Sequence, residues 1–449
     1  MDSAGLAQAV TNYWCESYDE QEEGRADHVP LPVITIAGIH RRIKRAQTSR
    51  TARAWLLKLG WNWKEVKKGV YQDGHERADV KSYRQDVFLP RMRRLQSQMV
   101  EWDEGLNVIE KSYESSSRPL VFITHDECTF NSNDGRKKIW IHEDHAPIRK
   151  KGRGQGLHVS DFLTPVGRLD QGKVCETLKC GGDVWWTGDL LLEQLQVKAI
   201  PAFEASFPGC QGLWAFDNAK IHQKYAPDAL QVGNMNLTPG GKNTVPMRPG
   251  YYIDPNNPLT TLLQQSMMLP DGRLKGLKIV LQERGLWPQQ SKFLTQCSIQ
   301  GKNPGERKPS PACKHASNAN CCARALLSSQ PDFLAQKCQL QETLEAAGHQ
   351  VIFYPVFHCE LNFIEYFWGR AKLYTRANCQ YTFPSLVRTV PVALAQIANQ
   401  LIWKYYQRTL RMMDAYRNNI VYGSEDFKRH VFTRYSSHRR IAESEIDVN

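Results

Sequence analysis

Hydrophobic positions recur at helical spacing in the first part of the chain. Between residues 39 and 59 they are interspersed with arginines and lysines, and Thr48 and Ser49 suit the cap of a second helix that begins near Arg50. Two helices broken at this point predict a helix-turn-helix. A strand-like stretch at 66–71 and a long helix beginning after Asp79 complete a predicted linker region.

From Pro119 the pattern changes to short apolar runs separated by Gly and Asn turns, namely LVFIT, KKIWIHED and HVSDFLTPVGRL. This pattern is typical of antiparallel strands. A further strand-like run, LWAF, precedes Asp217, and we expect helical structure from Tyr225 to Leu230. Strands first and helices interleaved later predict a mixed α/β domain.

Pro- and Gly-rich segments interrupt this pattern between residues 234 and 345, which we interpret as an insertion. Beyond it, VIFYPV predicts a strand, ELNFIEYFWGRAKLY a helix, and VPVALAQIANQLIWKYYQRTLRMMDAY further helix. The predicted organisation is a disordered lead-in at 1–32, a helix-turn-helix and linker helix at 33–100, a core at 115–233, the insertion at 234–345, the last part of the core with C-terminal helices at 346–420, and a basic tail at 421–449.

Composition narrows the class of protein. The 449 residues are 41% hydrophobic and 23% charged and contain no 18-residue apolar run, so we expect a soluble, globular protein without a membrane partner. The first residues lack the pattern of a secretory signal, which predicts reduced cysteines. A net charge of +12 favours a polyanionic partner, and we expect double-stranded DNA.

Basic residues of the predicted helices are the candidates for DNA contact. When the apolar side chains of the second helix turn inward, Arg50, Arg53 and Lys58 are left to meet phosphates or base edges. The alternative is a basic helix face that is only solvated. The same two interpretations apply to the arginines of the linker helix, which are Arg84, Arg91, Arg93 and Arg94.

Three acidic residues stand where a metal-dependent nuclease needs them. Asp126 follows LVFITH, Asp217 follows LWAF, and Glu365 lies within a predicted helix. Mg²⁺ prefers oxygen ligands, and two such ions stabilise the attacking and departing oxygens of a displacement at phosphorus. Carboxylates at the ends of rigid strands are held preorganised for this task. Taken singly, such an Asp is more often a turn former and such a Glu is more often solvated.

Other residues compete for these roles. Alternation along a strand turns Glu127 away from Asp126, and Glu360 is a reserve ligand only. His222 either orients a phosphate or water near Asp217 or forms a structural hydrogen bond. The remaining competing acids of the domain are Asp134, Asp161 and Asp183.

The sequence around the acids resembles the mariner-like DDE superfamily. In that family an Asp-Asn followed four residues later by His marks the second acid, here Asp217, Asn218 and His222. An Asn-x-Ile-Glu-x-x-Trp-Gly block marks the third acid, here at 362–369, and an apolar strand followed by Asp-Glu marks the first, here beginning at Asp126. The resemblance spans roughly residues 119–375, and stretches such as YQDGHERADVKSYR and NCCARALL are similar to a fungal, transposon-derived subgroup of DDE endonucleases.

This resemblance implies an RNase H-like core of the retroviral-integrase type, in which Asp126, Asp217 and Glu365 hold two Mg²⁺ or Mn²⁺ ions. It implies a transposase or endonuclease that cuts DNA and joins the freed 3′ end to target DNA, which is DNA recombination and integration. Such enzymes act in the nucleus as dimers or larger assemblies on transposon ends. Two alternatives stay open: a domesticated or decayed copy that binds DNA without cutting it, and an RNase H-type enzyme that acts on hybrids.

The spacing of the acids departs from simple members of that family. Asp217 and Glu365 are 148 residues apart (365 minus 217), and the insertion accounts for the excess. Long surface insertions cost little loop entropy, so this one spares the carboxylates if its ends lie close together.

Cysteines of the insertion form a second candidate metal site. Cys297, Cys313, Cys321 and Cys322 offer thiolates of the kind that bind structural Zn²⁺. Their gaps lack the paired C-x-x-C of zinc knuckles, so reduced, partly buried thiols are the alternative. Cys359 beside His358 is a poor nucleophile pair, because neighbouring side chains on a strand point to opposite faces.

Overall fold

The computed structural model of the chain divides into two compact units. The first contains Met1–Trp186, Ala205–Pro208 and Tyr354–Asn449, and the second contains Thr187–Glu204 and Gly209–Phe353. The structure describes residues 33–36, 39–42, 49–58, 62–65, 74–113, 118–136, 138–141, 151–181, 184–242, 244–253, 262–288, 293–300, 307–309 and 321–432. Among these residues, no helix combines the length and apolar character that a bilayer-spanning segment requires.

An antiparallel sheet is the centre of the first unit. β8 pairs with β6 on one side and with β10 on the other, and β9 pairs with the end of β8. The apolar, β-branched run at 120–124 is fully buried, as expected for a strand covered on both faces. The strands are β6 (Leu120–Asn131), β8 (Gly156–Thr164), β9 (Gly167–Arg168) and β10 (Glu176–Cys180).

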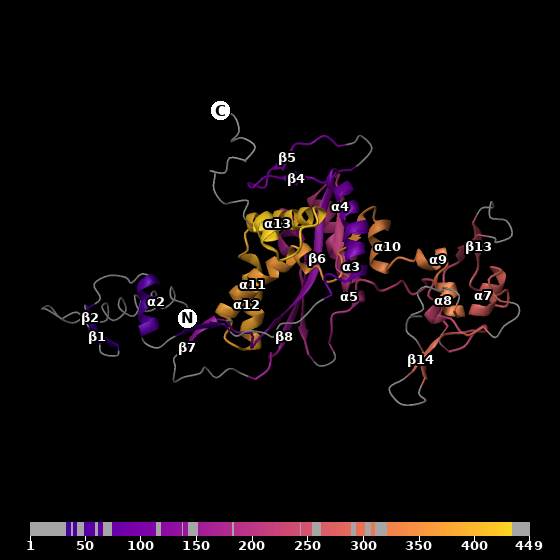
Figure 1. Cartoon of the computed structure of the whole chain (residues 1–449), viewed down its shortest axis with the longest axis horizontal. Coiled ribbons are helices and arrows are strands. Elements are labelled where there is room, and N and C mark those ends of the chain that lie inside the picture. Colours follow the sequence, from indigo (N-terminus) through magenta and orange to yellow (C-terminus); the bar gives the residue numbers. More distant parts are fainter. Residues whose placement is uncertain are drawn as a thin grey trace. The chain divides into compact units, whose positions relative to one another are not determined.

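Helices from the end of the chain pack on this sheet. α11 (Ile364–Asn378) contacts β6, α12 (Phe383–Ala395) and α13 (Asn399–Arg417), and the three helices lie side by side in Figure 1. The single helical run expected after 390 is wrong in one respect, since residues 396–398 separate α12 from α13. Trp368 of α11 is buried and meets Phe130 of β6 edge to face.

The remaining elements of the first unit are β1 (Val33–Ile36), β2 (Ile39–Arg42), α2 (Ser49–Lys58), β3 (Asn62–Glu65), α3 (Ala78–Ser82), the π-helical η1 (Tyr83–Phe88), α4 (Leu89–Gln96), β4 (Glu101–Trp102), β5 (Val108–Ile109), β7 (Lys138–Ile141), the short helices η2 (Leu169–Gly172) and η5 (Cys359–Leu361), and α14 (Glu425–Phe432). α3, η1 and α4 run on from one another, which confirms the helix expected after Asp79.

The predicted helix-turn-helix is half right. α2 confirms the second helix, which begins at Ser49. The first helix is wrong at 39–42, because these residues form β2 and pair antiparallel with β1. The β-branched residues of the VITI run favour a strand, and the Ile36–Ile39 pair closes a hairpin across two residues. Residues 1–32, 43–48 and 66–73 lie outside the described residues.

In the second unit, β11 (Gln211–Phe216) pairs in parallel with β16 (Gln350–Phe353), so antiparallel and parallel pairing both occur and the α/β class is confirmed. The expected helix at Tyr225–Leu230 is absent from this described stretch, since Pro227 disfavours helical geometry at Ala226. The other elements are α5 (Gly188–Gln194), η3 (Leu195–Ala199), α6 (Ile200–Ser206), η4 (Val232–Asn234), β12 (Gly250–Tyr252), β13 (Leu263–Gln265), α7 (Leu277–Glu283), β14 (Ser298–Gln300), β15 (Arg307–Pro309), α8 (Ala323–Ser328), α9 (Pro331–Leu334) and α10 (Gln339–Ala346).

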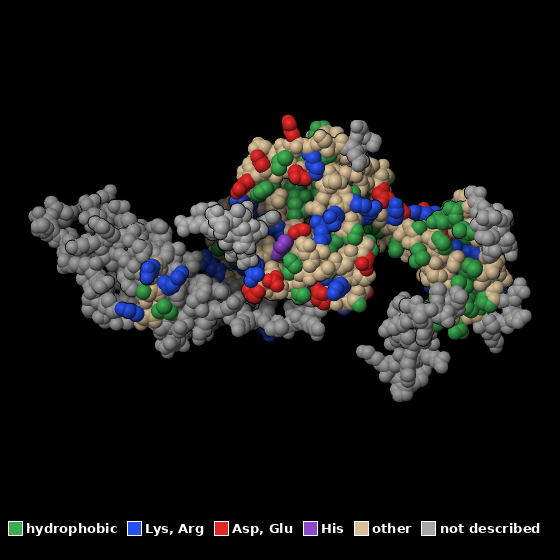
Figure 2. Space-filling view, turned by 45° about the horizontal axis from the view of Figure 1, so that its top comes forward, with side chains coloured by type: hydrophobic (Ala, Val, Ile, Leu, Met, Phe, Trp, Pro, Cys, Tyr) green, Lys and Arg blue, Asp and Glu red, His purple; other side chains and the backbone are tan. Residues whose placement is uncertain are grey.

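The insertion has a hydrophobic core of its own, formed by Leu230, Met235, Met267, Leu277, Val280, Leu281, Ala323, Leu326, Leu327 and Phe333. The chain segments on either side of this core meet, because Tyr225 forms a β-bridge with Cys338 and the Gln339 amide donates to the Lys224 carbonyl (2.8 Å). Figure 2 shows hydrophobic side chains on the visible surface of this region, where Leu262, Met268 and Leu294 are exposed. The insertion is therefore a small body closed at its base.

Candidate active site

Asp126 lies in the interior of β6. The expectation that it ends a strand is wrong, because pairing with β8 continues to Asn131. Its Oδ1 accepts a hydrogen bond from the Glu127 amide (2.8 Å). Glu127 shares the opposite face with His125, whose Nε2 lies 3.9 Å from Glu127 Oε1. The predicted alternation therefore holds, and Asp126 points away from Glu127.

Glu365 is exposed in the first turn of α11, and Asn362 fixes where that helix begins. Asn362 Oδ1 accepts from Thr124 Oγ1 (2.6 Å) and from the Ile364 amide (3.4 Å), and its Nδ2 donates to the His125 carbonyl (3.3 Å). One buried amide thus fastens the start of the helix to the two residues of β6 that precede Asp126. This explains why the motif needs an Asn three residues before its Glu.

The carboxylates of Asp126 and Glu365 both act on the pKa of the same two thiols, those of Cys128 and Cys359. Burial raises the pKa of Cys128 to about 11, Lys372 acts to lower it, and the carboxylates of Asp126 and Glu365 both add to the rise. Burial, and then charges that include the same two carboxylates, raises the pKa of Cys359 to about 11. Both acids therefore lie within electrostatic reach of the same two sulfur atoms. Lys372 is a residue that motif reasoning missed, although it lies two turns after Glu365 on the same helix.

Asp217 follows β11 in the second unit and is held by local contacts. Its Oδ1 accepts from the Ala219 amide (2.9 Å) and forms a short hydrogen bond with His222 Nδ1. The same nitrogen lies 3.2 Å from the Asp217 carbonyl oxygen, which only accepts, so Nδ1 carries the proton. His222 is buried and packs on Phe216. The structure shows the hydrogen bond to Asp217, whereas a role of His222 in orienting a phosphate or water stays a prediction.

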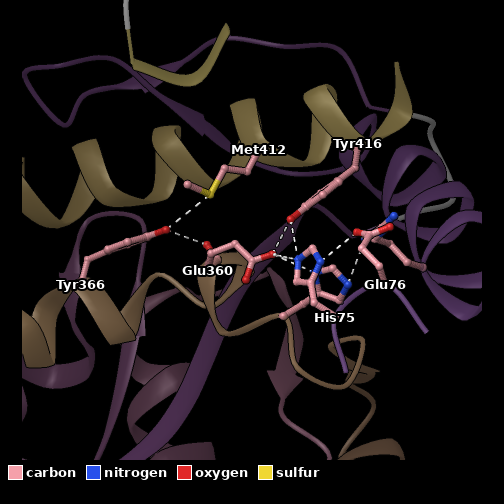
Figure 3. Close-up of polar contacts among 8 residues, drawn as sticks. His75, Glu76, Glu360, Tyr366, Met412 and Tyr416 are labelled. Carbon is pink, nitrogen blue, oxygen red and sulfur yellow. Dashed lines mark hydrogen bonds and ion pairs between the residues drawn. The ribbon is translucent and has the colours of Figure 1, made fainter. Parts of the chain in front are cut away.

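Glu360 is not a reserve ligand for this site, because its carboxylate is engaged elsewhere. Its Oε1 accepts hydrogen bonds from Tyr416 Oη (2.6 Å), His358 Nδ1 (2.7 Å) and His75 Nε2 (3.2 Å). Figure 3 shows His75 and Tyr416 beside Glu360. Burial acts to raise the pKa of Glu360, but these donors lower it to about 2. The prediction failed because residues 75 and 416 are remote in sequence.

The contacts of this buried network act on the protonation of its two histidines, His358 and His75. Arg84 Nη1, which only donates, lies 3.2 Å from His358 Nε2, so His358 is neutral and donates from Nδ1. Burial lowers the pKa of His358. Burial also acts to lower the pKa of His75, but contacts with Glu360 and Glu76 outweigh it and raise that pKa. Arg84 is buried here, so both interpretations given for it, DNA contact and a solvated helix face, are wrong.

The other competing acids have structural partners. Asp161 lies opposite Asp126 in the sheet register, is buried, and bonds to Arg168 Nε (2.6 Å). Asp134 pairs with Arg376 Nη2 (2.9 Å). Asp183 lies outside the described residues.

The remaining predicted residues fall into two groups. Arg50, Arg53 and Lys58 are all exposed on α2, as DNA contact requires. Cys297, Cys321 and Cys322 lie together, whereas Cys313 is outside the described residues. The raised pKa of Cys359 agrees with the expectation that it is a poor nucleophile.

Comparisons with known proteins give structural matches only. No protein-family model matches the chain, and no curated protein matches it. The Mos1 transposase paired-end complex with left transposon end is 10% identical, with a TM-score of 0.39, and the match covers 83% of this chain and 70% of that chain. The Mos1 mariner paired end complex with Mn is 11% identical, with a TM-score of 0.40 over 83% of this chain and 71% of that chain. The Mos1 transposase catalytic domain with Raltegravir and Mg is 8% identical, with a TM-score of 0.35 over 78% of this chain and 98% of that chain. The chain is thus similar to structures of a mariner transposase, the family that its own motifs resemble.

Proposed function

We propose that this protein is a DDE-type transposase or endonuclease that cuts DNA and joins the ends to target DNA. The observation that carries the proposal is the amide of Asn362, which fastens the helix of Glu365 to the strand residues beside Asp126. Asp126, Asp217 and Glu365 are the proposed ligands of two Mg²⁺ or Mn²⁺ ions. We further expect action in the nucleus and assembly as a dimer or larger complex on DNA.

The donor set fits a hard divalent cation. Asp126 and Glu365 offer carboxylate oxygens, and the Asp217 side chain is 48% exposed. When bound, such ions lower the pKa of the attacking hydroxyl and stabilise the departing oxygen.

Other residues of the chain have supporting roles in this proposal. His222 holds the carboxylate of Asp217, and Asn362 positions Glu365. Lys372 supplies a positive charge near the first and third acids that suits a DNA phosphate. The exposed basic residues of α2 supply salt-dependent affinity for the DNA backbone.

The test is metal-dependent nicking of supercoiled DNA by the purified protein. Asp217→Asn, Asp126→Asn and Glu365→Gln should each slow nicking by at least about 100-fold, since each removes part of a stabilisation of several kcal/mol. Asp189→Asn and Glu104→Gln change exposed acids of the second and first unit and should keep the wild-type rate. Equal background cleavage in all variants, with DNA still bound, would instead indicate a non-catalytic DNA-binding protein. Cleavage of RNA–DNA hybrids alone would indicate an RNase H-type enzyme.

A further inference from the structure

Three cysteines meet in the insertion from two separate segments. Cys297 precedes β14, and Cys321 and Cys322 precede α8. Their Sγ atoms all lie within 4.8 Å of one another. Cys322 is buried and the other two are half-buried, so the cluster lies at the edge of the insertion core.

The backbone holds these segments in register. The Ala323 amide donates to the Leu294 carbonyl (2.8 Å), and the Arg324 amide donates to the Thr295 carbonyl (3.2 Å). Arg324 also donates through its side chain to the carbonyls of Val232 (3.0 Å) and Met235 (3.1 Å). These hydrogen bonds hold the two cysteine-bearing segments together without involving the sulfur atoms.

The sulfur geometry fits a tetrahedral ion. Thiolates at about 2.3 Å from Zn²⁺ lie about 3.8 Å apart in a tetrahedron. Cys297 Sγ and Cys321 Sγ are 3.6 Å apart. A disulfide requires about 2.05 Å, so these two sulfurs are not bonded to each other.

The surroundings favour a thiolate at one of these positions. Cys322 Sγ accepts a hydrogen bond from the Ala325 amide (3.5 Å), and a donor to sulfur stabilises its charged form. Thiolates select soft or borderline ions such as Zn²⁺ over Mg²⁺. This set therefore differs in chemistry from the carboxylates proposed for the nuclease.

The insertion also has reason to need a cross-link. Its hydrophobic core is small, and large apolar side chains such as Leu262 and Leu294 stay exposed. Bodies of this size are commonly stabilised by a disulfide or a structural metal.

We propose that Cys297, Cys321 and Cys322 bind one Zn²⁺ ion that links the segment before β14 to α8. The ion is structural, and this inference stands apart from the proposed nuclease activity. Zinc binding adds its free energy to folding, because the unfolded segments do not present a preformed site.

The experiment uses the full-length protein, expressed with zinc and purified without chelator. Elemental analysis should find about one zinc per chain in the wild type. Cys297→Ser and Cys321→Ser should lose most of it, whereas Cys210→Ser, which changes a half-buried cysteine of the same unit outside the cluster, should keep it. Exchange with Co²⁺ should give a sulfur-to-cobalt charge-transfer band in the near ultraviolet that depends on the same two residues.

A wild-type measurement keeps the test decisive if a variant fails to fold. Chelator treatment should lower the unfolding temperature of the wild type and of Cys210→Ser alike, and added Zn²⁺ should restore it. Wild-type protein with no zinc and no cobalt band would overturn the proposal. A Cys297–Cys321 disulfide found by mass spectrometry of the untreated protein would overturn it as well.

Discussion

The two units hold their proposed catalytic acids in different ways. Asp217 is held by Ala219 and His222, which follow it within five residues. Glu365 is placed by Asn362, whose two partners on β6 are 238 and 237 residues away in the chain. One acid therefore depends on a local turn, and the other depends on the tertiary fold.

This difference extends to the segment that leads into α11. η5 contains Glu360, whose carboxylate accepts hydrogen bonds from His75 and Tyr416. These two donors are 341 positions apart in the sequence. Figure 3 also shows Tyr366 of α11, which donates to the Glu360 carbonyl (2.9 Å). A change in the N-terminal linker or in α13 should therefore alter the start of α11, whereas it should leave the turn after β11 unaffected.

The largest expected effect on stability comes from Glu360→Gln. It removes the negative charge that accepts hydrogen bonds from His75, His358 and Tyr416 in a buried site, which costs about 3–5 kcal/mol. Urea unfolding at neutral pH measures this loss. Glu101→Gln is the control, because its side chain is 55% exposed and pairs with Lys111 at the surface, where at most about 1 kcal/mol is expected.

The effect of Glu360 should depend on pH. Its pKa falls from 4.5 to about 2 on folding, so its contribution is present above pH 4.5 and is lost as the pH falls toward 2. The gap in unfolding free energy between wild type and Glu360→Gln should narrow over that window. His75 has the opposite sign: its pKa is raised, so its contribution is present below pH 6.5 and is lost as the pH rises through the folded value. A gap that stays constant from pH 5 to pH 3 contradicts the network.

Asn362→Ala tests the long-range link to Glu365. It leaves the buried Thr124 hydroxyl and His125 carbonyl with one partner fewer each, which costs about 1–3 kcal/mol of unfolding free energy. Nicking should fall as well, because the start of α11 is no longer fastened. Asn378→Ala, at the exposed end of the same helix, should change neither quantity.

His222→Ala tests the local link to Asp217. We expect a loss of about 1–2 kcal/mol from the missing hydrogen bond and slower nicking, with the pH response of Glu360 unchanged. His430→Ala removes a half-buried histidine paired with Asp414, outside the two proposed settings of the acids, and serves as the control. If His222→Ala altered the pH dependence of unfolding that Glu360 causes, the surroundings of Asp217 and the Glu360 network would not be independent of each other.

The smallest effect on stability is expected on α2. Changing Arg50, Arg53 and Lys58 together to Ala should leave the unfolding free energy within about 0.5 kcal/mol, because all three are exposed. The slope of log affinity for DNA against log salt should fall by about 0.9 for each phosphate that the protein no longer neutralises. The matched control changes three exposed lysines elsewhere, namely Lys173, Lys337 and Lys428. Equal slopes in both triple variants would favour the solvated-helix alternative.

The contrast between local and long-range contacts also marks what the sequence could predict. The strand before Asp217 and the helix of Glu365 follow from patterns within a few residues, and both were predicted. The hydrogen bond between Asp217 and His222 is also local, but the sequence left the role of His222 open. The partners of Glu360 could not be predicted from the sequence, because no local pattern indicates that His75 contacts Tyr416.

Backbone details were missed for a similar reason. The run at 39–42 carries basic residues typical of a helix, but pairing with 33–36 makes it a strand. The length of β6 past Asp126 depends on its partner β8, whose register is a tertiary property. Composition predicts an insertion at 234–345, and only the structure shows that Tyr225 and Cys338 form a β-bridge beside it.

That closure has a consequence for the order in which the chain folds. Leu213 of β11 pairs with Gln350 of β16, which lies 137 residues later (350 minus 213). If the insertion forms first and brings Tyr225 to Cys338, the loop left to close shrinks to roughly 25 residues, which lowers the entropic cost by about 1.5 kcal/mol. Folding of the insertion would then speed the parallel pairing of β11 with β16, on which the position of Asp217 depends. The folding rate of the insertion would in turn limit the folding rate of the second unit.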